Sequence, residues 1–284
     1  MKKKLILQPG KMGDIVITTP IAQYYADQGY EVVWPVFDNY IDYFKQFPDI
    51  KTFSLGVSMN PYVYYTNTRI DANNPDVFIM AGVEFFRKLA AWLTKQPDQE
   101  EYEVLDFCFT FPGHRNDINN QMTQIFSKRN RNWIDLKYFL ANVPLQERWN
   151  YSWTRDLEKE QKLYNFITSY AKEKYGSEKY SIVHQYKNGK KLPDVEVSNP
   201  INFSYIKGYE IYDWTMVLEN AQAIMCVDSC LANYVEVIPS LKKVTKHYLG
   251  SEEPHFHPYM RNILINNWIN HSESDVAYNE FSLD

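Results

Sequence analysis

Short apolar runs alternate with amphipathic stretches along the first half of the chain. The runs are rich in β-branched and aromatic residues, as buried parallel strands are, and the stretches between them show helical periodicity. Strands are predicted over residues 4–8, 31–37, 51–55, 77–80 and 104–109, and helices over 21–28, 40–46 and 83–95. Alternation of this kind is typical of right-handed β–α–β units built on a parallel sheet.

A second alternating block follows a helical region. Helices are predicted over 116–141 and 157–175, with a polar and aromatic linker at 144–152 between them. Beyond them the pattern predicts strands at 180–184, 202–206 and 223–227, helices at 213–221 and 231–238, and edge strands at 243–249 and 262–265. The sequence therefore predicts two doubly wound, Rossmann-like α/β domains that face a cleft, residues 1–150 and 151–270, followed by a tail at 271–284.

The composition is that of a globular chain. Of the 284 residues, 45% are hydrophobic and 16% aromatic, enough to build one large or two modest cores. The net charge of −5 disfavours nucleic acid as a partner, although a basic groove around 128–131 would favour it. No apolar run is long enough for a membrane span or a signal peptide. Three cysteines in apolar segments predict core thiols and a reducing, cytoplasmic compartment.

The segment KLILQPGKMGDIVITTP, near the N-terminus, places one carboxylate just beyond a predicted strand. The strand leads into a loop of Gly10, Lys11, Met12 and Gly13, and Asp14 precedes an apolar helix. Glycines let the backbone approach a ligand, and a helix N-terminus favours anions. The loop is therefore a candidate for contact with a phosphate or an acceptor, and Asp14 is the candidate catalytic residue. The alternative is an ordinary turn in which Asp14 only caps the helix.

A similar turn from strand to acid to helix stands in the second block. An apolar strand ends in Asp228 and Ser229, and a helix follows at once. Ser229, Asn233 and Glu236 are spaced at i, i+4 and i+7 and share one helical face, where they would meet a phosphate or a ribose. The alternative is again helix capping, with Asn233 and Glu236 merely solvated.

A lysine-bearing loop follows the first strand of that block. Lys190 and Lys191, next to Gly189, would clamp a pyrophosphate, or would belong to a charged hairpin in solvent.

No metal site is predicted, because His255 and His257 have no third ligand at a recognised zinc spacing. The Asp-x-Asp pair typical of metal-dependent sugar transferases does not occur in the chain.

Two of these motifs resemble a known family. The segment 211–238 resembles the donor-binding segment of heptosyltransferase-like glycosyltransferases, family 9. Near the N-terminus, the chain also resembles the signature of that family, at Gly13, Asp14, Val16, Thr18 or Thr19, and Pro20. The resemblance implies a two-domain GT-B fold, with an acceptor-side N-terminal domain and a C-terminal domain that binds the nucleotide sugar. It also implies inversion at the anomeric carbon with no essential metal and no cofactor. Where the family often has Gly-x-x-His, this chain has Cys230 and Asn233.

The resemblance also assigns roles to individual residues. Asp14 matches the general base, and Asp228 and Ser229 match the acid and the hydroxyl of the donor loop. Lys190 or Lys191 falls near a lysine of the family that contacts the donor phosphate. Independently of the resemblance, Glu210 or Tyr212 would hold the base or the ribose, because they lie on the loop before the predicted donor helix. The full set of expected donor-binding residues is Lys190, Lys191, Glu210, Tyr212, Asp228, Ser229, Asn233 and Glu236.

We therefore expect a cytoplasmic glycosyltransferase that moves a sugar from a nucleotide sugar to an acceptor hydroxyl, inverting and independent of metal. The acceptor would be a glycan, a lipid-linked molecule or another hydroxyl compound, and a modified DNA base is a further option. Two alternatives remain open: a sugar-nucleotide epimerase or hydrolase on the same fold, and a nucleotide-binding protein without turnover. Release of the nucleoside diphosphate without an acceptor would separate these classes.

Overall fold

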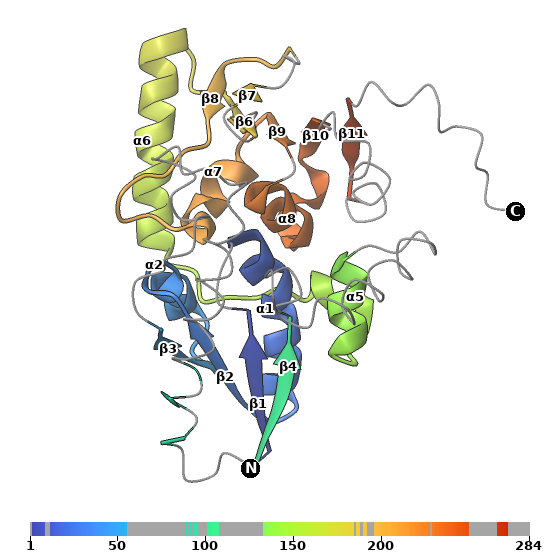
Figure 1. The fold of residues 1–284 in the computed structure, drawn as a ribbon. Helices are drawn as coiled ribbons and strands as arrows, with labels where there is room; N and C mark the ends of the chain where they lie inside the picture. The colour runs from blue at the N-terminus through green and yellow to red at the C-terminus, as the bar shows by residue number, and fades with distance from the viewer. Residues whose placement is uncertain are drawn as a thin grey trace, which may run out of the picture. The chain divides into compact units, whose positions relative to one another are not determined.

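The structure is a computed structural model of the chain, shown in Figure 1. It describes residues 2–8, 12–55, 89, 91–92, 94–95, 101–107, 133–184, 186–187, 190–191, 196–227, 229–249 and 266–271. The chain divides into two compact units, Met1–Thr154 and Arg155–Asp284. The predicted boundary, after residue 150, lies in the same connecting segment.

The first unit contains a four-stranded sheet. Its strands lie in the order β3-β2-β1-β4, and every neighbouring pair is parallel. Leu5, at the centre of β1, lies opposite Val33 of β2 and Val104 of β4. The apolar run of β1 is buried from Lys4 to Leu7, as a central parallel strand requires. The strands are β1 (Lys3–Leu7), β2 (Glu31–Val36), β3 (Ile50–Ser54) and β4 (Tyr102–Asp106).

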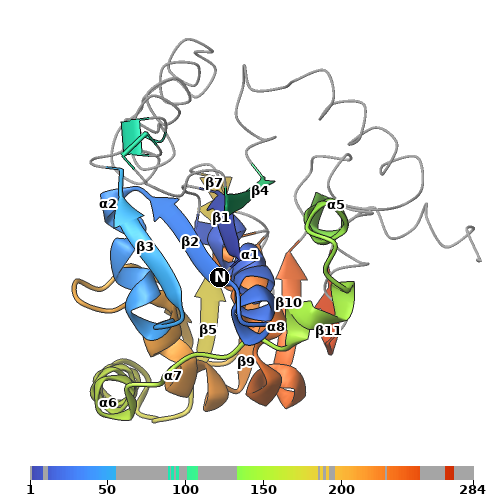
Figure 2. The same cartoon turned by 90° about the horizontal axis from the view of Figure 1, so that it is seen from below.

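Helix α1 (Met12–Asp27) follows β1 and packs against the sheet (Figure 2). It is apolar on nearly all sides and buried from Asp14 to Ala22, as a helix enclosed by other elements should be. The periodic pattern predicted a helix over residues 21–28, and the motif predicted an apolar helix after Asp14. The observed helix includes both stretches, with Pro20 inside it. A proline in a helix removes its own N–H donor without always ending the helix. The remaining helical elements are α2 (Asp38–Ile41), η1 (Asp42–Gln46), α5 (Trp133–Leu140) and η5 (Leu145–Trp149).

The second unit contains a five-stranded parallel sheet in the order β11-β10-β9-β5-β8. Numbered along the chain, this order is 2-1-3-4-5 read from the other edge, which is one of the two common doubly wound orders. The strands are β5 (Ser181–His184), β8 (Pro200–Asn202), β9 (Ala223–Val227), β10 (Thr245–Leu249) and β11 (Trp268–Asn270). A separate antiparallel pair joins β6 (Tyr186–Lys187) to β7 (Lys190–Lys191).

The longest helix of this unit, α6 (Leu157–Tyr175), has a cap at each end. The Asp156 side chain accepts a hydrogen bond from the Lys159 amide, and Gly176 ends the helix in the left-handed conformation, with φ of 70°. Its inner face, with Leu163, Ile167 and Ala171, is buried. The shorter elements are η6 (Ile211–Trp214), α7 (Thr215–Glu219), α8 (Cys230–Val237) and η7 (Pro239–Lys243).

The predicted α/β fold class is confirmed, since both units are built on parallel sheets joined through helices. Strand β11 was not predicted, and the predicted strand at 202–206 is observed at 200–202. The predicted strands at 77–80 and 262–265 lie outside the described residues.

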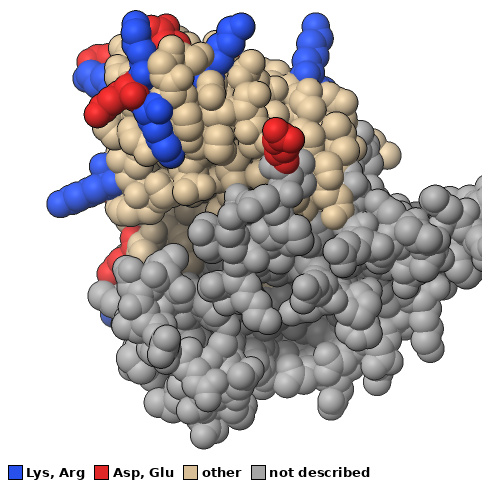
Figure 3. Space-filling model, turned by 90° about the horizontal axis from the view of Figure 1, so that it is seen from above, with Lys and Arg blue, Asp and Glu red and all other residues tan. Residues whose placement is uncertain are grey.

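On the face seen in Figure 3, Lys and Arg side chains stand apart from one another, and several have acidic side chains beside them. Exposed pairs of this kind include Lys162 with Glu158 and Lys172 with Glu178, at N–O distances of 2.6 and 2.9 Å. Such surface pairs contribute little to stability. Within the described ranges, no helix combines the length and the hydropathy needed to cross a membrane.

Candidate active site

The carboxyl ends of β1 and β4 form the topological switch point of the first sheet. From β1 the chain runs through α1 to β2 and β3 on one side, and β4 then pairs with the opposite side of β1. Ligands of open α/β sheets bind in the crevice at such a point. Asp14, in the first turn of α1, lies just beyond the end of β1, as the sequence predicted.

Asp14 is paired there with a buried lysine. The Lys137 Nζ lies 2.9 Å from Asp14 Oδ1, and the two side chains are 0% and 9% exposed. The same ammonium donates hydrogen bonds to Gln8 Oε1, at 2.8 Å, and to Thr18 Oγ1, at 3.3 Å. Three acceptors therefore match the three N–H donors of the lysine. The ring of Phe107, just after β4, lies with its centroid 5.7 Å from Nζ.

Burying an ammonium is costly unless it is paired and hydrogen-bonded, so this arrangement needs all of its partners. Lys137 lies on α5 and is 123 residues from Asp14 in the chain, and sequence reasoning missed it. A signal was present, because Lys137 occupies the same helical stripe as Ile134, Tyr138 and Ala141, which are all buried. A lysine in an apolar stripe indicates a buried charge that needs a partner.

The glycine loop before Asp14 is shorter than predicted. Met12 and Gly13 belong to the first turn of α1, and Gly10 and Lys11 lie outside the described residues. The apolar run that follows Asp14 packs into the core, which extends the helix back to Met12. Asp14 is therefore part of the helix, and its side chain is directed to Lys137.

The switch point of the second sheet lies between β5 and β9, which are neighbours although β8 comes between them in the chain. His184 ends β5, and Ser229 follows β9 as the residue before α8. His184 Nδ1 lies 3.1 Å from Ser229 Oγ, and Ser229 Oγ donates a hydrogen bond to the Val227 carbonyl, at 3.0 Å. Because the hydroxyl proton is used on Val227, Ser229 accepts from an Nδ1–H of His184. Burial lowers the pKa of His184.

The side chains predicted to share one face of α8, those of Ser229, Asn233 and Glu236, have different hydrogen-bond partners. Asn233 Nδ2 donates to the Ser229 carbonyl, at 3.2 Å, so these two residues do lie together. The Glu236 carboxylate accepts hydrogen bonds from Asn266 Nδ2, at 2.9 Å, and from Trp268 Nε1, at 2.8 Å. Glu236 is fully buried and joins α8 to β11. The structure thus brings together Ser229 and Asn233, whereas the partners of Glu236 lie in β11 and just before it.

Glu210 and Tyr212 lie at the start of η6. Glu210 is its N-terminal cap and forms a reciprocal capping box with Asp213, and Tyr212 is buried. Asp213 also pairs with Lys159, at 2.7 Å. The backbones of Lys190 and Lys191 form β7, and their side chains, like the whole of Asp228, lie outside the description.

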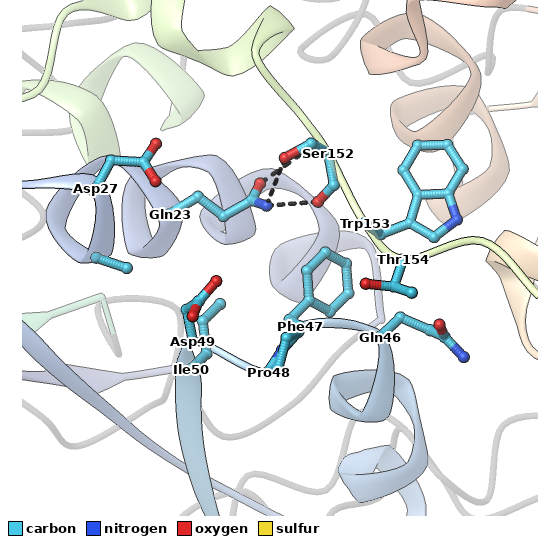
Figure 4. Close-up of a pocket in the computed structure, with 11 residues that line it drawn as sticks. Gln23, Asp27, Gln46, Phe47, Pro48, Asp49, Ile50, Ser152, Trp153 and Thr154 are labelled. Carbon is cyan, nitrogen blue, oxygen red and sulfur yellow. Dashed lines mark hydrogen bonds between the residues drawn. The ribbon is translucent and has the colours of Figure 1, made fainter.

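A cavity of about 280 Å³ opens in the first unit, at the end of α1 far from Asp14 (Figure 4). Gln23 and Asp27 line it from α1, and Asp49 and Ile50 line it at the start of β3. Gln23 Nε2 is hydrogen-bonded to Ser152 Oγ, at 3.1 Å. At 1.5 Å of rise per residue, this end of α1 is about 18 Å from Asp14 along the helix. The cavity therefore contains none of the predicted site residues.

The cysteines of the second unit are unreactive. Burial raises the pKa of the Cys226 thiol and also that of Cys230, to about 11, so both thiols stay protonated at neutral pH. Among the residues that the structure describes, no group of three or more His, Cys, Asp or Glu side chains is placed to hold a metal ion.

No protein-family model matches the chain, and no curated protein matches it. Several solved structures resemble it over most of its length. A family 9 glycosyltransferase from Veillonella parvula DSM 2008 is 10% identical, covers 95% of this chain and 86% of its own, and has a TM-score of 0.39. E. coli heptosyltransferase WaaC with ADP-2-deoxy-2-fluoro heptose is 11% identical, with 95% and 92% covered and a TM-score of 0.44. E. coli ADP-heptose lps heptosyltransferase II is also 11% identical, with 95% and 90% covered and a TM-score of 0.45.

These structures include members of the family that the two sequence motifs resemble. At these identities and TM-scores the likeness concerns the fold, and a fold by itself does not determine function.

Proposed function

We propose that this protein is a glycosyltransferase that moves a sugar from a nucleotide-sugar donor to a hydroxyl of a glycan, a lipid-linked molecule or another acceptor. The observation that carries the proposal is the Asp14–Lys137 pair at the carboxyl ends of β1 and β4. It places a buried carboxylate with a fixed position where the ligands of such sheets bind. The Asp228–Ser229 turn and the expected phosphate contacts of Lys190 or Lys191 supply the donor side of the proposal.

In the proposed reaction, Asp14 takes the proton of the acceptor hydroxyl while that oxygen attacks the anomeric carbon. The new glycosidic bond forms as the bond from that carbon to the diphosphate breaks, and the nucleoside diphosphate leaves with the bonding electrons. Attack from the face opposite the leaving group inverts the anomeric centre. The Lys137 ammonium, 2.9 Å from Asp14 Oδ1, would hold this carboxyl group in position for the proton transfer.

The leaving diphosphate needs positive groups that are already in place. The N-terminal turn of α8, which begins at Cys230, carries backbone N–H groups and the positive end of the helix dipole. Lys190 or Lys191 would add a full positive charge. This route uses no metal ion, which agrees with the lack of an Asp-x-Asp pair in the sequence.

The first test is a thermal-shift screen of the wild-type chain against nucleoside diphosphates and nucleotide sugars. Binding stabilises the folded state by about 2.7 kcal/mol at a hundredfold excess over Kd, which is easily seen. A selective response to one base identifies the donor class and allows a transfer assay with acceptor hydroxyls. A flat response to the UDP, GDP, ADP, CMP and TDP series would contradict the proposal.

The second test addresses the base. Asp14→Asn should lower the rate of transfer by about 10²- to 10⁴-fold, the usual contribution of a general base, with nucleotide affinity changed only a few-fold. Asp27→Asn is the matched control, because Asp27 ends the same helix and is exposed. Unimpaired turnover of Asp14→Asn would rule out its role as the base.

A further inference from the structure

An unsatisfied amide oxygen lies beside the Ser229 turn. Asn233 is only 6% exposed, and its Oδ1 has no hydrogen-bond partner among the described residues. Buried polar atoms are nearly always hydrogen-bonded, so an orphaned one needs an explanation. Asn233 lies one turn into α8, and its amide contacts the backbone of Ser229.

The orientation of this amide is fixed by its neighbours. Its Nδ2 donates to the Ser229 carbonyl, at 3.2 Å, and the Asn233 backbone N–H donates to the same oxygen, at 3.2 Å. Reversing the amide would place its oxygen against that carbonyl oxygen, and two acceptors repel each other. The unpartnered atom is therefore the acceptor, Oδ1.

The nearby imidazole of His184 also presents a hydrogen-bond acceptor. His184 donates through Nδ1–H to Ser229, so its neutral ring has Nε2 as an acceptor. The ring is also held by Phe203, in an edge-to-face contact with centroids 5.7 Å apart. The switch point of the second sheet thus combines an amide oxygen and an imidazole nitrogen that both accept hydrogen bonds.

Phosphate oxygens cannot satisfy these atoms, because they are acceptors too. We propose that Asn233 Oδ1, beside His184, binds a hydroxyl group of the donor, carried by its ribose or by the sugar to be transferred. This inference rests on the proposed function and assigns the hydroxyl-bearing part of the donor to the Asn233 side of α8. In this arrangement, the backbone N–H groups at the start of α8 bind the diphosphate.

The role makes an unusual prediction about stability. Asn233→Leu has a similar volume and removes the orphaned oxygen, so the melting temperature of the free protein should stay the same or rise. Removing a residue that only supports the structure would lower it. The matched control is Asn220→Leu, because Asn220 Nδ2 makes the same i−4 bond, to the Met216 carbonyl at 2.8 Å, on an exposed residue.

Binding is measured by calorimetry with three probes: inorganic pyrophosphate, the nucleoside diphosphate selected by the screen, and its nucleotide sugar. In Asn233→Leu the affinity for pyrophosphate should be unchanged. The affinity for the ligand that carries the hydroxyl should fall about tenfold, because one hydrogen bond is lost. If the affinity for the nucleoside diphosphate already falls, the hydroxyl that Asn233 binds belongs to the ribose. If only the affinity for the nucleotide sugar falls, the hydroxyl belongs to the transferred sugar. Asn220→Leu should bind all three probes as the wild type does.

The outcomes separate the two proposals. If the wild type binds nucleotides and Asn233→Leu binds them equally well, or melts well below Asn220→Leu, the hydroxyl subsite is wrong and the glycosyltransferase proposal is unaffected. If the wild type binds none of the probes, the glycosyltransferase proposal fails and the subsite fails with it.

Discussion

Replacing Lys137 by Met should strongly destabilise the first unit. The change keeps an unbranched apolar side chain and removes the terminal ammonium, with its charge and its three donors. It leaves the Asp14 carboxylate, the side-chain amide oxygen of Gln8 and the Thr18 hydroxyl without the ammonium that they share.

The size of the effect follows from burial. Lys137 is fully buried and the Asp14 side chain is 9% exposed, so water replaces little of the lost interaction. Breaking a buried pair by removing one partner costs about 3–5 kcal/mol, a large share of the roughly 5–15 kcal/mol that stabilises a typical domain. Adding Asp14→Leu removes the stranded charge as well, so the double variant should recover about 2–3 kcal/mol of this loss.

The assay is urea unfolding followed by ¹⁹F NMR of 5-fluorotryptophan, which distinguishes the individual tryptophans. Trp34 is buried in the first unit, and its Nε1 donates to the Gln8 carbonyl at 2.7 Å, so it reports on the end of β1. Trp214 is buried in the second unit and serves as the reference.

Lys4→Met is the matched control, because Lys4 is also buried but its partner Glu103 is 53% exposed and can be hydrated when left alone. Its effect should be clearly smaller. The reasoning would be refuted if Lys137→Met unfolded within about 1 kcal/mol of the wild type, or if the double variant were no more stable than the single one.

Two further predictions concern the second unit. Burial lowers the pKa of His184, so the unfolded chain binds this proton at a higher pH than the folded chain. The free energy of unfolding should therefore fall as the pH drops below about 6.5, and His184→Gln should show a weaker fall in urea titrations; parallel profiles would contradict this. Glu236→Ala should destabilise the unit by about 2–4 kcal/mol, because Trp268 Nε1 and the Asn266 amide lose a buried charged acceptor. The nucleotide affinity of the folded Glu236→Gln variant should be unchanged in calorimetry. A large loss of affinity would show that Glu236 contacts the donor after all.

Local pattern was enough to predict much of the fold. The apolar runs that became β1, β2, β5 and β9 were found because a buried parallel strand needs an unbroken apolar segment. Helical periodicity predicted only residues 21–28 of α1, because the segment from Asp14 to Pro20 is apolar on nearly all sides and shows no amphipathic pattern. Strand β11 was missed because three residues carry too little pattern to be recognised.

The residues of the candidate site were also only partly predictable from the sequence. Asp14 and Ser229 were found from sequence because each directly follows a strand that the pattern reveals, and the ends of parallel strands meet at one edge of a sheet. Lys137 could not be assigned to Asp14, because its partner is 123 residues away and only the packing of α5 brings the two together. The roles of Glu236 and Asn233 also differ only in three dimensions, since helical spacing places them on one face but cannot show that one is bonded to Trp268 and the other has a free acceptor.

The sequence by itself thus determined the α/β class, the alternation of strands and helices, and the two strand ends that carry polar residues. These features depend on interactions between neighbours in the chain. The tertiary structure decided which charges are paired and which polar atoms are satisfied. Burial and electrostatic interaction depend on distance in space, and the side chains that set them come from elements far apart in the sequence.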